Sequence, residues 1–211
     1  MEFAVTLIFI LIILVFSTVL HELAHGFVAY KLGDDTAKLS GRLSLNPIKH
    51  IDPIMSIAVP MVLYLMGGPI FGGAKPVPIN TNKLKGGEWG FAAVAIAGPL
   101  TNIVLSFIFF LIAFWMGFDD GGIAGQVALY GMYINMGFAF FNIIPIPPLE
   151  GSRVLYALAP DFARDFLRKI EPYGLIVVYL VVFLLGNWFS NYMWSAQVGL
   201  LSAYKWLVGI R

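Results

Sequence analysis

Long apolar segments dominate this chain, and short polar stretches separate them. Six segments carry few charged side chains over most of their length: Phe3–Tyr30, Pro53–Phe71, Phe91–Gly117, Val127–Ile146, Tyr173–Phe189 and Tyr192–Val208. A helix of roughly 20 apolar residues is long enough to cross a bilayer. The pattern therefore predicts an all-α polytopic membrane protein with about five to six transmembrane helices.

The basic residues bear on whether the segment Pro53–Phe71 crosses the membrane or re-enters it. They form four groups: Lys31, Lys38, Arg42 and Lys49; Lys75, Lys83 and Lys85; Arg153, Arg164, Arg168 and Lys169; Lys205 and Arg211. If Pro53–Phe71 enters and returns on the same side, all four groups lie on that side, as the positive-inside rule requires. The N-terminus is then outside, with five crossings. Its prolines and the Gly67-Gly68-Pro69 break favour a re-entrant segment, and a kinked full span is the alternative.

Composition supports a single membrane domain over residues 1–211. Hydrophobic residues make up 59% of the chain, and charged residues 12%, about half the level of roughly 25% in soluble proteins. The chain has no cysteine, which excludes disulfides, thiol nucleophiles and cysteine zinc sites. A net charge of +1 without a basic arm predicts no nucleic-acid partner. Because the first apolar run lacks the positive leader of a signal peptide, we expect it to be retained as the first span.

An H-E-x-x-H pattern closes the first apolar segment. His21 and His25 lie four residues apart, so on a helix both imidazoles share one face and can bind one metal ion. Glu22 then stands beside the ion, where it can act as the general base of a hydrolase. An ionisable residue inside a membrane costs about 2.5–3.5 kcal/mol on insertion scales. Three such residues together predict a compensating cation, one Zn²⁺ per chain, rather than structural hydrogen bonds alone.

A catalytic zinc site needs a third protein ligand, and Glu150 is the best candidate. Three other carboxylates have basic neighbours that predict a solvated loop: Asp34, Asp35 and Asp52. Three prolines in residues 145–148 forbid a regular helix just before Glu150, so a new helix should begin near Leu149. With five crossings Glu150 lies in the same leaflet as the two histidines; with six it lies about 30 Å away.

Three motifs in this order resemble the site-2 protease family of intramembrane zinc metalloproteases: HELAHG, AGPLTN at 97–102, and N-x-x-P-x-x-P-L-E-G at 142–151. The likeness is closest to compact prokaryotic members without PDZ or CBS domains. It covers most of residues 20–160, within a catalytic core of 3–160 that a C-terminal helical hairpin at 173–208 follows. The resemblance implies that His21 and His25 are zinc ligands, that Glu22 is the general base and that Glu150 is the third ligand. The family normally has aspartate at that last position, so Glu150 is a departure.

The resemblance also assigns roles to Asn142 and to the segment FGGAKPVPIN. Asn142 matches an asparagine that steadies the tetrahedral intermediate; an interhelical hydrogen bond is the alternative. Asn102 and Asn135 lack such a match, and we interpret them as contacts between helices. The segment resembles a short membrane-associated β-loop that binds unwound substrate by strand addition, and a plain surface loop is the alternative. Its predicted substrate-binding residues are Gly73, Ala74, Lys75, Pro76 and Val77.

Together these features predict a zinc metalloendopeptidase that hydrolyses transmembrane substrates near the cytoplasmic leaflet of a prokaryotic cell membrane. Its expected partners are a membrane-embedded peptide or protein substrate and the lipid bilayer. Two other functions stay open. A metal transporter or channel would place polar residues along a path through several spans, whereas here the ionisable groups cluster at one depth. A catalytically impaired relative that only binds peptides is made credible by Glu150.

Overall fold

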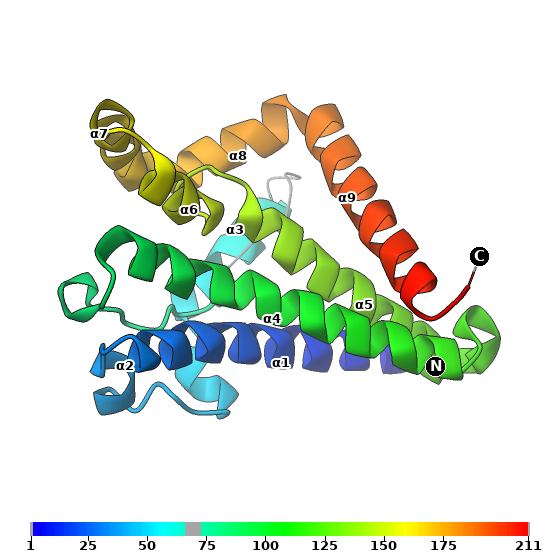
Figure 1. The fold of residues 1–211 in the computed structure, drawn as a ribbon. Coiled ribbons are helices and arrows are strands. Elements are labelled where there is room, and N and C mark those ends of the chain that lie inside the picture. Colours follow the sequence, from blue (N-terminus) through cyan, green and yellow to red (C-terminus); the bar gives the residue numbers. More distant parts are fainter. Residues whose placement is uncertain (1, 66–72, 211) are drawn as a thin grey trace.

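Three long helices form the body of the structure, a computed structural model that describes residues 2–65 and 73–210. They are α1 (Glu2–Lys31), α4 (Gly87–Trp115) and α5 (Gly122–Ile143). Figure 1 shows them side by side, and α4 packs against both of the others. α4 continues through Pro99, which membrane helices tolerate where neighbouring helices cover the backbone. Its buried face consists mainly of small residues, which let helices approach closely: Gly90, Ala92, Ala95, Ala97, Gly98, Ser106 and Ala113.

In the described part of the chain, two helices are long and apolar enough to cross a membrane, as a protein associated with a membrane requires. These are Val5–Lys31 within α1 and Gly87–Trp115, the whole of α4. A third span results if Asp161–Leu184 and Gly186–Leu207, which are bent by 91° at their break, count as one. By length and composition the described residues thus supply two or three spans. The larger number of five to six crossings stays a prediction.

The C-terminal part of the chain covers one side of the long helices. Its elements are α6 (Gly151–Leu158), α7 (Asp161–Ile170), the short η5 (Glu171–Tyr173), α8 (Gly174–Leu184) and α9 (Gly186–Leu207). α9 descends across the end of the bundle in Figure 1 and packs against α5. A buried cluster joins three helices there, because Phe110 of α4 and Met132 and Met136 of α5 pack with Tyr204 of α9. This cluster holds α9 against the long helices.

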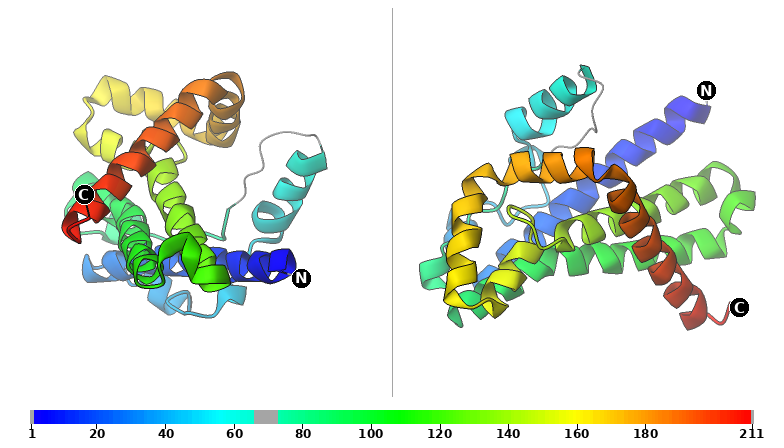
Figure 2. Two further views of the ribbon diagram at one scale, coloured as in Figure 1. Left: turned by 90° about the vertical axis from the view of Figure 1, so that its right-hand side faces the viewer. Right: turned by 90° about the horizontal axis from the view of Figure 1, so that it is seen from above.

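The predicted re-entrant segment is only partly described. A π-helical turn, η2 (Pro53–Ala58), runs into α3 (Val59–Leu65), and residues 66–72, with the Gly67-Gly68-Pro69 break, lie outside the described residues. The side chain of Asp52 accepts hydrogen bonds from the first amides of η2, which satisfies the start of the turn. Figure 2 shows η2 and α3 standing apart from the three long helices. Re-entry itself therefore stays a prediction.

Short helical turns join the remaining parts. These are α2 (Thr36–Leu39), η1 (Pro47–His50), η3 (Thr81–Lys83) and η4 (Phe118–Gly121). The expected β-loop is corrected by the structure: residues 73–80 run without regular structure, and no strand occurs in the described part of the chain. Prolines at 76 and 78 remove two backbone donors, which works against a regular ladder at this position.

The helix break after α5 is where the sequence predicts it. α5 ends at Ile143, the chain is irregular through the prolines, and α6 starts at Gly151. A Cβ on Gly151 would lie 1.8 Å from the carbonyl oxygen of Ile143, so only glycine fits this close return of the chain. The turn carries Glu150, at the N-terminus of α6, back towards the bundle.

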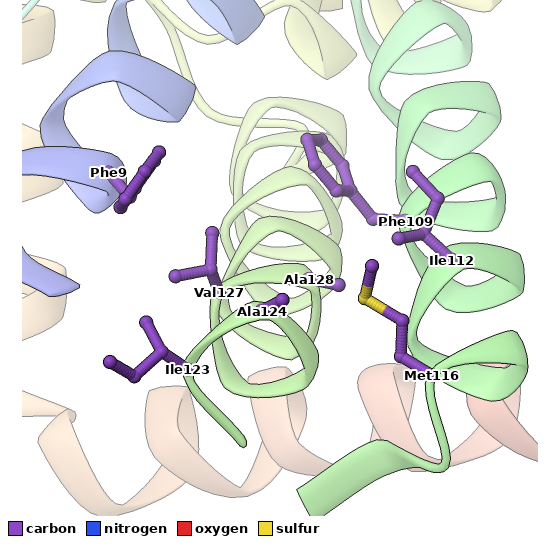
Figure 3. A pocket seen from close by; sticks show the side chains of 8 residues that line it. All are labelled: Phe9, Phe109, Ile112, Met116, Ile123, Ala124, Val127 and Ala128. Carbon is purple, nitrogen blue, oxygen red and sulfur yellow. The ribbon is translucent and has the colours of Figure 1, made fainter. Parts of the chain in front are cut away.

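An apolar pocket lies between α1, α4 and α5, away from the polar residues of interest. Figure 3 shows its lining, which encloses about 320 Å³: Phe9, Phe109, Ile112, Met116, Ile123, Ala124, Val127 and Ala128. Phe9 precedes His21 by 12 residues, or about 18 Å along a helix. With apolar side chains alone, this pocket cannot hold a metal ion.

Candidate metal centre

His21, His25 and Glu150 meet at one point of the structure. The two histidines come from α1 and are 6% and 7% exposed, and the partly buried Glu150 comes from the turn before α6. One possible ligand atom from each residue lies within 4.8 Å of the other two. Oε1 of Glu150 lies 2.7 Å from Nε2 of His21 and 2.9 Å from Nε2 of His25. Glu150, 129 and 125 residues further along the chain than His21 and His25, thus joins them in one cluster.

The remaining ring nitrogens show which nitrogen of each neutral imidazole carries the proton. Nδ1 of His25 lies 2.7 Å from the carbonyl oxygen of Val94, which can only accept a hydrogen bond. Nδ1 of His21 lies 2.5 Å from Oδ1 of Asn102, which is also an acceptor. Both rings are therefore protonated at Nδ1, and both Nε2 atoms point a lone pair at Glu150.

When both rings are neutral, Nε2 of His21, Nε2 of His25 and Oε1 of Glu150 face one another with no hydrogen atom between them. The other carboxylate oxygen of Glu150, Oε2, is buried and has no hydrogen-bond partner among the described residues. Leaving a charged acceptor buried and unpartnered is costly, so the arrangement calls for a cation. Two imidazoles and one carboxylate form a ligand set that suits catalytic zinc. The residues present therefore fit Zn²⁺.

Gly98 of α4 forms the floor of the cluster. A Cβ built on Gly98 would lie 2.5 Å from Nε2 of both His21 and His25. A side chain at this position would fill the space onto which the two lone pairs open. The helix backbone can approach the imidazoles this closely only because residue 98 is glycine.

Glu22 lies against the predicted substrate-binding segment. Its Oε2 accepts a hydrogen bond of 2.7 Å from the amide of Val77. The backbone of Lys75 is also held, because its amide donates to the carbonyl of His50 and its carbonyl accepts from Arg42, at 2.8 and 2.6 Å. The structure therefore brings the predicted base and the predicted substrate segment together.

Asn142 lies in the last turn of α5 and bonds within its own helix. Its Nδ2 donates to the carbonyl of Phe138 at 3.0 Å. None of its described hydrogen bonds joins it to the histidines or to Glu150. The role of Asn142 at an oxyanion stays a prediction.

Sequence reasoning missed the contact of Asn102 with His21, one of the predicted metal ligands. The interhelical role expected of Asn102 and Asn135 is confirmed, since their side chains bond across α4 and α5 at 2.8 Å. Asn102, however, also holds Nδ1 of His21. A signal was available: ligating histidines nearly always donate their second ring proton to an acceptor. Asn102 lies one helical turn after Gly98 and on the same face of α4.

Asp34 is buried, so the prediction of a solvated loop is wrong for this residue. Its Oδ1 accepts from the amide and hydroxyl of Thr36 at 3.0 and 2.5 Å, and its Oδ2 accepts from the amide of Asn80 at 2.6 Å. Burial alone would raise the pKa of Asp34, but hydrogen bonds from Thr36 and Asn80 outweigh it, and the pKa is lowered. Asp34 therefore ties the end of α1 to the segment that Glu22 holds at Val77.

Replacing Asp34 with asparagine should lower the free energy of unfolding by about 1–3 kcal/mol, because an amide nitrogen would face the Asn80 N–H. The folded-state pKa of Asp34 is depressed, so its stabilisation is present above the unfolded pKa and is lost as pH falls through the folded value. Unfolding in detergent at neutral and acidic pH measures both effects. Asp35→Asn is the matched control, since Asp35 makes only an exposed ion pair with Lys83. Equal losses in the two variants would contradict the assignment.

Comparisons with known proteins point to the same chemistry. No family model matches the chain, and no solved structure matches it. The protein named "Putative zinc metalloprotease YwhC" of Bacillus subtilis is 41% identical over 182 residues, which cover 83% of this chain and 80% of that protein. "Putative zinc metalloprotease Rip2" of Mycolicibacterium smegmatis is 30% identical over 208 residues, 93% of this chain and 77% of its own. "Putative zinc metalloprotease MJ0611" of Methanocaldococcus jannaschii is 37% identical over 94 residues, 44% and 47% of the two chains.

The helical membrane fold, the ligand set of two histidines and a glutamate, and these relatives define a zinc metalloprotease. Within that class, the chain belongs to the site-2 protease family, whose three motifs it carries in order. Glu150 departs from the aspartate that the family normally has at this position. Its longer side chain reaches both Nε2 atoms from the turn before α6.

Proposed function

We propose that this chain is an intramembrane protease that hydrolyses peptide bonds of membrane-embedded protein substrates. The observation that carries the proposal is the depth of the metal centre. His25 and His21 lie 6 and 10 residues before the end of α1 at Lys31, which is about 9 and 15 Å along the helix axis. α1 is long enough to span a bilayer whose apolar core is about 30 Å thick. A cluster at that depth would meet peptide bonds inside the membrane.

The proposed site faces the cytoplasmic leaflet. Lys31 ends α1, and Arg153 follows Glu150 in α6, so positive charges lie at the end of the bundle that holds the cluster. Cytoplasmic ends of membrane helices carry such an excess of lysine and arginine. The N-terminus of the described chain is then outside, and a prokaryotic cell membrane is the proposed location.

The roles of the side chains follow from their positions. When bound, zinc supplies a Lewis acid that polarises the scissile carbonyl and makes water more acidic. Glu22 would take a proton from the attacking water and pass it to the leaving amine. Asn142 would donate to the developing oxyanion once its amide leaves the carbonyl of Phe138.

The segment at 73–77 would contact an unwound substrate. Backbone groups of Gly73, Lys75 and Val77 bond to the protein, at Met55, His50 and Glu22 among others. The amide and carbonyl of Ala74 make no hydrogen bond with the described residues, so they are available to a substrate peptide.

A transport function is less well supported. Among the described residues, one group of histidine and acidic side chains is arranged to hold a metal ion, and it lies at a single depth. A pathway would need further ligands along the bundle. A group of ligands at a single depth suits a reaction centre instead.

The proposal is tested by cleavage of a membrane peptide in liposomes that contain the purified protein. We expect cuts within the apolar stretch, detected by mass spectrometry, complete loss after treatment with a zinc chelator, and recovery when Zn²⁺ is added back. Zinc uptake into sealed vesicles without cleavage would favour a transporter. Stoichiometric zinc without even a single turnover would identify a catalytically impaired relative.

A further inference from the structure

We propose that Asn135 and Asn102 are positioning residues that fix which nitrogen of His21 is free to bind metal. The inference rests on the metal site of the proposed function and concerns how that site is kept ready. A line of buried hydrogen bonds runs from the backbone of α5, through both asparagines, to Nδ1 of His21 in α1. Which group donates at each step is decided at the end remote from His21, by the backbone carbonyl of Gly131.

The carbonyl of Gly131 is the fixed end of this line. It lies 2.8 Å from the side-chain amide of Asn135, and a carbonyl oxygen can only accept a hydrogen bond. The NH₂ group of Asn135 must therefore face Gly131, and its Oδ1 faces Asn102 on α4. The hydroxyl of Ser17, 2.9 Å from the same NH₂ group, can donate or accept and so does not decide the direction.

The second asparagine transmits this direction to the histidine. Oδ1 of Asn135 lies 2.8 Å from the NH₂ group of Asn102, so Oδ1 of Asn102 is left to face His21. That oxygen lies 2.5 Å from Nδ1 of the ring and requires a proton there. In the neutral ring Nε2 is then bare and faces Glu150. The choice of ring proton thus traces back to a backbone group two side chains away.

Burial makes the direction hard to reverse. Both asparagines are 0% exposed and Ser17 is 2% exposed, so bulk water cannot replace a lost partner. Flipping one amide alone would set donor against donor or acceptor against acceptor in a medium of low dielectric constant. If these hydrogen bonds served only to hold the helices together, their contribution would depend on their strength and not on which group donates.

Two substitutions at Asn135 separate positioning from adhesion. Asn135→Leu removes the acceptor that orients Asn102, and we expect the zinc affinity to fall about 10- to 100-fold, the range for lost outer-shell partners of metal ligands. Asn135→Asp, protonated in its apolar surroundings, keeps an acceptor towards Asn102 and a donor towards Gly131. It should bind zinc nearly as well as the wild type, even if its unfolding temperature falls.

Tyr204→Phe is the matched control. Tyr204 and Ser106 form another buried polar contact between helices, at 2.7 Å, and it does not lead to His21. Zinc affinity is measured by competition with a chromophoric chelator in detergent, alongside thermal unfolding of the metal-free proteins. The ¹⁵N spectrum of labelled histidines in the metal-free protein reports the ring protons directly. It should show a protonated Nδ1 at His21 in the wild type and in Tyr204→Phe, and mixed forms in Asn135→Leu.

The outcomes keep the two proposals apart. If the leucine and aspartate variants lose zinc affinity equally, or if zinc affinity in all variants follows unfolding temperature alone, the positioning role is wrong. If wild-type protein binds no zinc, the proposed function fails. The histidine spectra then still decide the relay, which is overturned if His21 keeps the same ring proton in Asn135→Leu.

Discussion

Replacing Gly98 with alanine is expected to lower the zinc affinity of the protein by more than about 100-fold. The new methyl group would lie 2.5 Å from Nε2 of both histidines, in the space that their lone pairs share with Glu150. Losing an outer-shell partner costs about 10- to 100-fold in metal affinity, and displacing the ligands themselves should cost more. Chelator competition measures the affinity, and cleavage of a membrane peptide should fall with it.

Gly199→Ala is the control for a methyl group added to a helical glycine. Gly199 lies within α9, and nothing lies within 4 Å of the position of its Cβ. Alanine is favoured over glycine in a helix by about 1 kcal/mol, so this variant should be as stable as the wild type or more so. Gly199→Ala should therefore fold and keep its zinc, and only Gly98→Ala should lose it. Normal zinc binding by Gly98→Ala would show that the ion sits elsewhere.

The convergence of His21, His25 and Glu150, the three predicted metal ligands, could be predicted largely from local rules. The spacing of His21 and His25 places both rings on one helix face, and the prolines before Glu150 force a break that brings its carboxylate inwards. The structure contains both features, and the three side chains meet. The choice of Glu150 also rested on the exclusion of the other carboxylates, on the five-crossing topology and on the family resemblance.

The features that could not be predicted depend on pairs of distant elements. Asp34 looks solvated beside basic neighbours, yet its partners include the amide of Asn80, 46 residues away. The direction of the Asn102 amide depends on Asn135 of α5 and on a backbone carbonyl of that same helix. The β-loop was expected from a resemblance, and residues 73–80 instead spend their backbone groups on side chains and loops. Such contacts between residues far apart in the sequence cannot be predicted from the residues around each of them.

α4 shows how one helix face can serve several purposes at once. Gly98 admits the imidazoles, Asn102 holds one ring, and the carbonyl of Val94 holds the other. The three positions are four residues apart and therefore lie along one stripe of the helix. A membrane helix lined with small residues can pack tightly and still offer polar groups to a buried site. α4 thus orients the two histidines that α1 supplies.

Replacing Glu22 with glutamine should slow cleavage greatly while leaving zinc bound. The glutamine oxygen can still accept the hydrogen bond from Val77, so the segment at 73–77 and the ligands should keep their places. The amide cannot take a proton, however, and a positioned general base contributes about 10²- to 10⁴-fold to rate. We expect a loss of that size in single-turnover cleavage of a membrane peptide, with one zinc per chain retained. Because substrate contacts remain, the loss should fall on the chemical step rather than on peptide binding.

Glu88→Gln provides the comparison, since Glu88 is an exposed glutamate in the first turn of α4. It should cleave at the wild-type rate, which would exclude a general effect of removing a negative charge from the protein. The informative contrast is between two glutamine variants that both bind zinc, of which only one is inactive. If Glu22→Gln cleaves as fast as Glu88→Gln, the proton must be taken by another group. Glu150 would then be the next candidate, because its Oε2 is the buried carboxylate oxygen without a partner in the described structure.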